Sequence, residues 1–75
     1  MTAVREAILN LLKRHPEGLT DNDIAHLYDG PLASASGLRT RRSELVNAGL
    51  VVDSDRRDTL ASGRKAVVWE VAPRV

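Results

Sequence analysis

Cysteine is absent from this chain of 75 residues, so a disulfide bond, a thiolate nucleophile and a cysteine-ligated metal are excluded. Glycine-rich phosphate loops are also missing. The only two histidines, His15 and His26, lack metal-ligand spacing. Asp23 and His26 stand three residues apart, which is typical of a surface contact on a helix. The sequence therefore predicts no enzymatic activity, no metal and no cofactor.

The chain has no apolar run long enough to cross a bilayer, no signal-peptide pattern at its N-terminus and no internal repeat. We therefore expect one cytoplasmic domain over residues 1–75, without a membrane partner. A chain of this length without disulfides buries only a modest core. A homodimer or a larger protein partner would add stability.

Aromatic residues are limited to Tyr28 and Trp69. One aromatic without neighbours is weak support for a platform that stacks single-stranded nucleic acid. Trp69 alternates onto the same strand face as Val67 and Val71, so we expect it to be the largest member of the core. Tyr28 is expected to pack at the end of a helix.

Net charge is low, at +1, but it is unevenly distributed. Residues 1–33 carry three basic and five acidic side chains, a net charge of −2, whereas residues 34–65 carry seven basic and four acidic ones, a net charge of +3. The second half of the chain is therefore the half that a polyanion would attract. Because the excess is small, affinity for nucleic acid should be modest and sensitive to salt.

The first half of the chain is expected to form a helical scaffold. Apolar residues at positions 4, 7, 8, 11 and 12 predict an amphipathic helix that Thr2 caps and that Pro16 ends. Thr20 and Asp23 predict a capping box, followed by a short helix to about Tyr28. The scaffold would then support whatever the more basic second half contacts.

A third helix is expected over residues 35–48, with Ser34 or Ser36 as its N-cap and Gly49 as its left-handed C′ residue. A helical wheel places short polar side chains on the outer face, with an arginine at the edge: Ser36, Thr40, Ser43, Asn47 and Arg39. Such side chains suit base edges and phosphates in a major groove, although any solvated helix also has a polar outer face.

Other positions of this helix leave alternatives open. Arg42 lies between Leu38 and Leu45 on the inner face, so a packed stem and an acidic or carbonyl partner for its head are favoured over a contact with DNA. Arg41 lies on a flank, where a phosphate contact and a solvated or ion-paired state are equally consistent with the pattern. Gly37 either permits close approach of the backbone to DNA or indicates that the helix begins later.

A β-hairpin is predicted after this helix, from the β-branched runs over residues 50–52 and 66–71. The expected loop, residues 53–65, holds four basic side chains suited to the sugar-phosphate backbone or the minor groove: Arg56, Arg57, Arg64 and Lys65. Three aspartates in the loop either pair with these arginines and shape the loop or leave it nearly neutral. The short segment Leu32-Ala33 is expected to add an edge bridge to the hairpin.

The order of these parts, with the segments LRTRRSELVNAGLVVDS and SGRKAVVWEV, resembles small winged-helix DNA-binding proteins, including compact ones encoded by bacteriophages and actinobacteria. The resemblance implies an α+β winged helix-turn-helix fold of three helices plus a C-terminal β-hairpin wing. It also implies that the third helix enters the major groove and that the wing contacts backbone or minor groove. The chain lacks the long additional helix that many winged-helix repressors use to dimerise.

We therefore expect sequence-specific binding of double-stranded DNA by a small transcriptional or replication-associated regulator. The expected DNA-binding residues come from the third helix and the loop: Ser36, Arg39, Thr40, Arg41, Ser43, Asn47, Arg56, Arg57, Arg64 and Lys65. The alternative is a protein-protein interaction module of the same fold, such as a viral protein that docks to a host factor. Salt-insensitive binding to a protein would favour that alternative.

Overall fold

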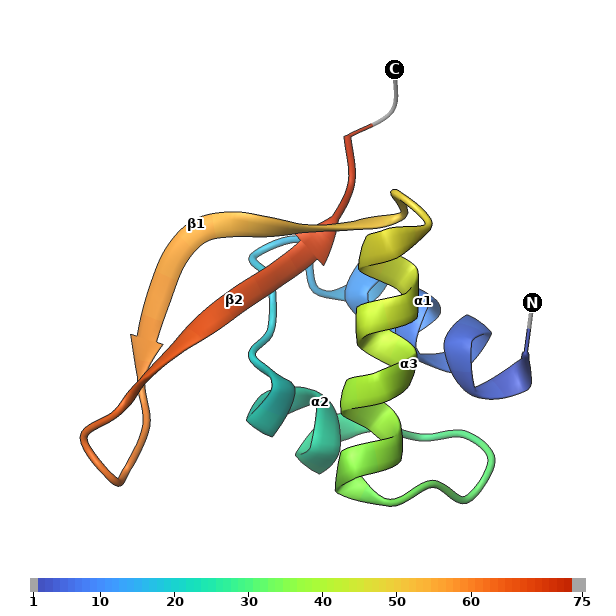
Figure 1. Ribbon diagram of the computed structural model, residues 1–75, viewed down its shortest axis with the longest axis horizontal. Helices are drawn as coiled ribbons and strands as arrows, with labels where there is room; N and C mark the ends of the chain where they lie inside the picture. Colours follow the sequence, from blue (N-terminus) through green and yellow to red (C-terminus); the bar gives the residue numbers. More distant parts are fainter. Residues whose placement is uncertain (1, 74–75) are drawn as a thin grey trace.

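The computed structural model describes residues 2–73 and shows an α+β arrangement in which three helices precede a two-stranded antiparallel sheet (Figure 1). The elements in chain order are α1 (Ala3–Arg14), α2 (Asp21–Leu27), α3 (Ala35–Asn47), β1 (Val51–Thr59) and β2 (Lys65–Val71). The predicted three helices and C-terminal hairpin are confirmed. None of the helices within residues 2–73 has the length and apolarity needed to span a bilayer.

Each helix begins at a hydroxyl cap. The side chains of Thr2, Thr20 and Ser34 accept hydrogen bonds from backbone N–H groups in the first turns of α1, α2 and α3. Thr20 also forms the predicted capping box, because the Asp23 carboxylate accepts the Thr20 N–H at 3.1 Å. At the other end of α3, Gly49 takes the left-handed conformation with φ of 78°. Since Ser34 is the N-cap, α3 begins before Gly37 and includes it.

The core of the described residues is aliphatic. Its buried members come from every element except β2, together with the α1–α2 connection: Ile8, Leu11, Leu12, Leu19, Ile24, Leu38, Leu45 and Val51. Full burial of one such side chain contributes about 1.5–3 kcal/mol. Trp69 packs against this cluster but is only partly buried, so the expectation that it is the largest core member holds only in part. Tyr28, the C-cap of α2, packs against the same cluster.

The hairpin is longer than the sequence indicates. Residues 53–59, which were expected to form a loop, continue β1, and Thr59 pairs with Lys65 at the far end. The connection is reduced to residues 60–64, where the Leu60 N–H donates to the Arg64 carbonyl at 2.8 Å and Gly63 has φ of 85°. The strand extends because cross-strand hydrogen bonds override the low strand propensity of its aspartates and serine.

An irregularity divides β1 into two halves. Asp53 pairs with Trp69 and Arg57 pairs with Val67, so three residues of β1 lie opposite Val68 alone. Within this bulge Asp55 has φ of 67°, a conformation that non-glycine residues adopt rarely and that aspartate tolerates better than most. Figure 1 shows β1 bending sharply near its middle, and the tip of the hairpin protrudes to one side of the three helices.

The prediction of an edge bridge at Leu32-Ala33 is wrong, and a bridge to the hairpin forms from another segment of the chain. Leu32 is fully exposed, and neither it nor Ala33 forms a bridge. Instead Leu19, between α1 and α2, pairs with Trp69 through two backbone hydrogen bonds of 2.9 and 2.8 Å. The sequence pointed to Leu32-Ala33 because it is apolar and follows a turn. Leu19 is the residue that packs into the core beside β2, and its backbone therefore reaches the strand.

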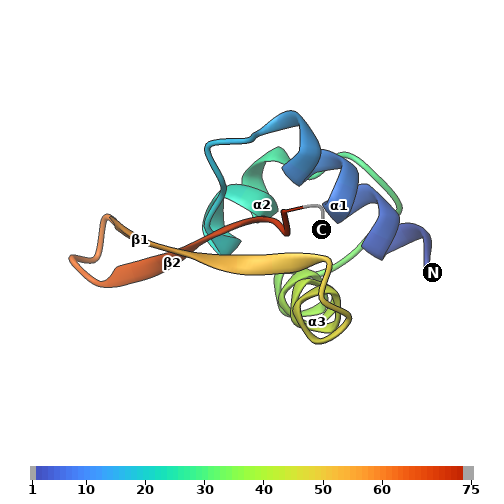
Figure 2. The ribbon, with the colours of Figure 1, turned by 90° about the horizontal axis from the view of Figure 1, so that it is seen from above.

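The helices lie on two sides of the molecule. Viewed from above, α3 lies on one side of the base of the hairpin, and α1 and α2 lie on the other (Figure 2). The buried Leu38 and Leu45 are on the inner face of α3, which leaves its opposite face exposed to solvent. The protruding hairpin and the outer face of α3 are thus the two features that the scaffold presents.

Candidate nucleic-acid interface

The outer face of α3 is polar and carries no charge. Its four central side chains are exposed and lie within one to three turns of each other: Ser36, Thr40, Ser43 and Asn47. The Thr40 hydroxyl donates to the Ser36 carbonyl at 3.0 Å. Within residues 2–73 the side chains of Ser43 and Asn47 have no hydrogen-bond partner, so their donors and acceptors are available to a ligand.

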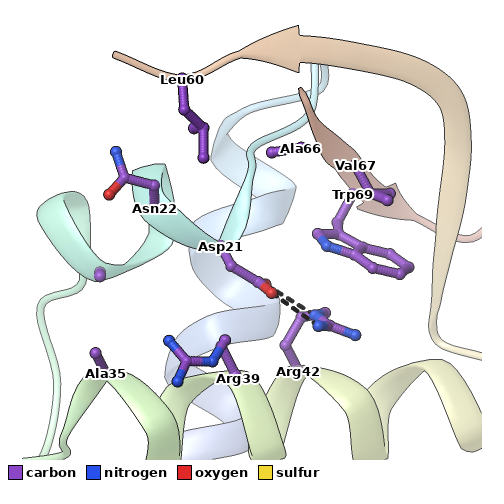
Figure 3. Close-up of a pocket in the computed structure, with 10 residues that line it drawn as sticks. Asp21, Asn22, Ala35, Arg39, Arg42, Leu60, Ala66, Val67 and Trp69 are labelled. Carbon is purple, nitrogen blue, oxygen red and sulfur yellow. Dashed lines mark hydrogen bonds and ion pairs between the residues drawn. The ribbon is translucent and has the colours of Figure 1, made fainter. Parts of the chain in front are cut away.

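Arg39 stands at the edge of this face, on the side toward the hairpin. It lines a cleft of about 450 Å³ between α2, α3 and β2 (Figure 3). The lining is largely apolar apart from two arginines, one aspartate and one asparagine: Asp21, Asn22, Ala25, Ala35, Arg39, Arg42, Leu60, Ala66, Val67 and Trp69. Arg39 forms no ion pair with any residue that the structure describes, so the cleft has an uncompensated positive charge at its edge.

Arg42 occupies the inner part of the same cleft and has a structural role. Its guanidinium forms two parallel hydrogen bonds of 2.8 Å with the Asp21 carboxylate, and its central carbon lies 4.0 Å from the centre of the Trp69 ring (Figure 3). The bidentate geometry and the cation–π contact are both typical of strong arginine interactions. Arg42 therefore joins α3 to α2 and β2, which confirms the interpretation of it as a packed residue with an acidic partner.

Arg41 faces the other flank of α3, toward α1. Its Nη1 lies 3.2 Å from Glu44 Oε1, and Arg5 of α1 approaches the same oxygen at 3.6 Å. This oxygen is buried and has no aligned hydrogen bond within residues 2–73, so the three groups interact through charge alone. Of the two alternatives for Arg41, the structure contains the ion-paired one.

The four basic residues expected in the loop fall into two pairs. Arg56 and Arg57 lie on β1 and are engaged: Arg57 donates to both carboxylate oxygens of Asp53, at 2.9 and 3.1 Å. Arg56 donates to the Glu17 carbonyl and lies 3.5 Å from the Glu70 carboxylate. Arg64 and Lys65 lie at the tip of the hairpin, exposed, and form no ion pair with the residues described.

Electrostatics at the bend follows from these contacts. The bidentate hydrogen bonds from Arg57, followed by the Asp55 N–H at 2.8 Å, hold the pKa of Asp53 below its usual value. The Asp53 carboxylate therefore stays ionised and shapes the bend, so the alternative in which the aspartates pair with the arginines holds for Asp53 alone among the three. At the bend both arginines are thus paired with carboxylates, whereas Arg64 and Lys65 at the tip form no ion pair among the described residues.

The histidines take part in local contacts only. His26 Nδ1 lies 2.8 Å from the Asn22 carbonyl, and His15 Nδ1 lies 3.0 Å from the Glu17 carboxylate. Asp23 is occupied by the capping box rather than by His26. Across the part of the chain that the structure describes, no three residues of the types His, Cys, Asp and Glu are grouped to hold a metal ion.

Two members of the site were not singled out from the sequence. Asp21 is not among the site residues expected from the sequence, yet it neutralises Arg42. The signal for it was present, since an arginine on the inner face of a helix needs a carboxylate and the acidic first turn of α2 supplies one. Leu60, on the hairpin side of the cleft, had no sequence signal.

Comparison of the chain with protein-family models, with curated proteins and with solved structures gives no match.

Proposed function

We propose that this chain is a winged helix-turn-helix protein that binds double-stranded DNA sequence-specifically, with α3 as the recognition helix and the β1–β2 hairpin as the wing. The observation that carries the proposal is the exposed, uncharged polar face of α3, bordered by cations that have no ion-pair partner among the described residues: Arg39 beside the face, and Arg64 and Lys65 at the wing tip. α3 has 13 residues and is about 20 Å long, and a major groove admits a helix of this kind.

In this proposal α3 and the wing contact different parts of the DNA. Hydroxyl and amide side chains such as Ser43 and Asn47 hydrogen-bond base edges or phosphates, and an arginine forks onto guanine or a phosphate. Arg64 and Lys65, at the tip of the wing, contact the sugar-phosphate backbone or the minor groove of the DNA. The cleft that Arg39 borders separates the recognition helix from the wing. In this proposal the sugar-phosphate backbone between the major and the minor groove passes along this cleft.

In this proposal the protein is a small transcriptional or replication-associated regulator that acts in the cytoplasm, and it needs neither catalysis nor a cofactor. Few cations are free, because Arg41, Arg42, Arg56 and Arg57 are all paired within the protein. Affinity per domain is therefore modest, and a second copy or a partner protein would raise it.

A protein-docking role is the second candidate, and exposed leucines favour it. Leu27 at the end of α2 is 47% exposed and Leu32 is 101% exposed. A partner protein could cover these side chains without any contact with α3, whereas DNA offers them little.

The test is a fluorescence-anisotropy titration of the purified protein against a random duplex and a duplex obtained by selection, at low and near-physiological salt. Arg39→Ala is expected to weaken binding mainly to the selected duplex, and Arg64→Ala to weaken both and to reduce the salt slope by about one unit. Arg14→Ala is the matched control, since Arg14 is exposed at the end of α1 and its loss removes the same charge outside the proposed interface.

Equal losses of affinity for the two duplexes in Arg39→Ala would assign Arg39 to a phosphate instead of a base. Failure of the selection to enrich any sequence, together with loss of all binding at the higher salt, would favour the docking alternative.

A further inference from the structure

The direction of the wing depends on a single interruption of β1. Three β1 residues stand opposite Val68, and Asp55 among them has φ of 67°. Side chains replace the missing ladder bonds, because Asp53 Oδ1 accepts the Asp55 N–H at 2.8 Å and Ser54 Oγ accepts the Arg56 N–H at 3.2 Å. Such a bulge bends a strand, and these local contacts shape it, but on an exposed two-stranded hairpin they do not tie the distal half of the strand to the helices.

Arg56 supplies a link between the bend and the helical part of the molecule. Its Nη2 donates to the carbonyl of Glu17, in the connection that precedes α2, and lies 3.5 Å from the carboxylate of Glu70 on β2. Glu17 is 39 residues away from Arg56 along the chain. Of the two arginines at the bend, Arg56 is the one whose side chain reaches the helical part of the molecule, through this hydrogen bond. Arg57 pairs with Asp53 on its own strand.

The backbone at Gly18 is shaped to receive this contact. Gly18 has φ of 88°, and a Cβ there would lie 2.6 Å from Val68 Cγ1, 2.9 Å from the Trp69 carbonyl and 3.3 Å from Arg56 Nη2. A side chain at position 18 would therefore push the connection away from β2. The close approach places the Glu17 carbonyl within reach of Arg56.

We propose that Arg56 is a positioning residue: it braces the wing against the α1–α2 connection and thereby sets where the wing tip lies relative to α3, without contacting DNA itself. The inference rests on the proposed function for its consequence, namely that Arg64 and Lys65 meet the same DNA molecule as α3. The contact between Arg56 and the α1–α2 connection does not depend on the proposed function, because it can be measured on the free protein.

The first experiment measures the brace without DNA. Because the chain has no cysteine, spin labels can be attached to Asn10→Cys on α1 and Ser62→Cys at the wing tip, both exposed positions, and their distance distribution recorded by pulsed dipolar spectroscopy. Arg56→Ala is expected to broaden or shift the distribution, whereas Lys65→Ala, which removes a free cation of the wing, leaves it unchanged. Arg56→Lys retains a donor for the Glu17 carbonyl and is expected to restore it in part.

A distribution in Arg56→Ala as narrow as in the parent protein, with the same mean, would overturn the proposal whatever the protein binds. Unfolding does not confuse this result, because Arg56 has a side chain that is 55% exposed, and helical circular dichroism of each variant checks the scaffold.

The second experiment is a double-mutant cycle on affinity for the selected duplex. In the parent background Arg56→Ala is expected to weaken binding about fivefold, and in the Arg64→Ala/Lys65→Ala background it is expected to cost less than about twofold, because the brace then has no tip contacts to position. Equal costs in the two backgrounds, with a salt slope reduced by about one unit, would mean that Arg56 contacts a phosphate directly and would overturn the positioning role.

Discussion

At the residue scale, ion pairing divides the basic side chains into those that have an acidic partner within the protein and those that have none among the described residues. Arg42, Arg56 and Arg57 are paired with Asp21, Glu70 and Asp53, whereas Arg39 forms no ion pair among the described residues. The two exposed pairs, those of Arg56 and Arg57, contribute little to stability, but each of the three removes a cation that a polyanion could otherwise use. The number of arginines in the sequence therefore overstates the number available for DNA.

Arg42 is the basic residue whose loss is expected to cost the most stability. Arg42→Met keeps an apolar stem but leaves Asp21 without its partner and Trp69 without its cation–π contact. Because the Arg42 side chain is 15% exposed, the expected loss lies between that of surface and buried pairs, at about 1–2 kcal/mol. Urea unfolding followed by circular dichroism measures it.

Arg41→Met is the matched control for this prediction, since Arg41 is on the same helix and its side chain is 35% exposed. We expect a loss of less than about 1 kcal/mol from it. Equal losses from the two variants would show that the contacts of Arg42 with α2 and β2 add nothing beyond an ordinary surface pair.

At the scale of elements, the helices could be predicted more accurately than the hairpin. The caps at Thr2, Thr20 and Ser34 and the C′ residue at Gly49 act within a few residues of each helix end, so the signal for each boundary is local. β1 differs, because residues 53–58 read as a polar loop and become a strand only through pairing with β2. Arg56 and Arg57 were therefore expected in a loop and are found on a strand.

The bend of the wing is expected to depend on pH only in the acid range. Arg57 and the Asp55 N–H lower the pKa of Asp53 in the folded protein. A lowered pKa stabilises the fold above the unfolded pKa of about 3.9, and the stabilisation is lost as pH falls through the folded value. We therefore expect the bend to be unchanged between about pH 5 and pH 8 and to loosen below about pH 4.

The Asp55 amide proton reports this change directly, because it is hydrogen-bonded to Asp53 Oδ1 at 2.8 Å. Its NMR chemical shift, followed from neutral to acid pH, is expected to change with a midpoint below the ordinary value for aspartate. Asp53→Asn should abolish that transition. A midpoint at or above about 3.9 would contradict the proposed effect of Arg57.

At the scale of the whole molecule, charge is concentrated by folding rather than by composition. The chain has 11 basic and 10 acidic side chains, but within residues 34–65 the free cations gather beside α3 and at the wing tip. A ligand therefore meets unpaired cations at these two places although the net charge is only +1.

This distribution predicts a shallow salt dependence. With three free cations at the proposed interface, each contributing about 0.9 to the slope, affinity for duplex DNA is expected to fall about 40-fold between 50 and 200 mM salt. Anisotropy titrations at four or five salt concentrations measure the slope. A slope of about 4.5 instead of about 2.7 would indicate that Arg56 and Arg57 leave their carboxylates to bind phosphates.

The sequence alone determined the three helices, the caps of the first two and the buried stripe of α3, because helical periodicity and capping act between residues close in the chain. It also determined the presence of a C-terminal hairpin, through its two β-branched runs. It also indicated that the Arg42 guanidinium has an acidic or carbonyl partner. Only the tertiary structure decided the length and bend of β1, the bridge at Leu19, and which cations remain free. Those features depend on distances through space: Arg42 meets a carboxylate 21 residues away, and Arg56 meets a carbonyl 39 residues away. An ion pair depends on the distance between two charges in space, so no periodic pattern in the sequence predicts it.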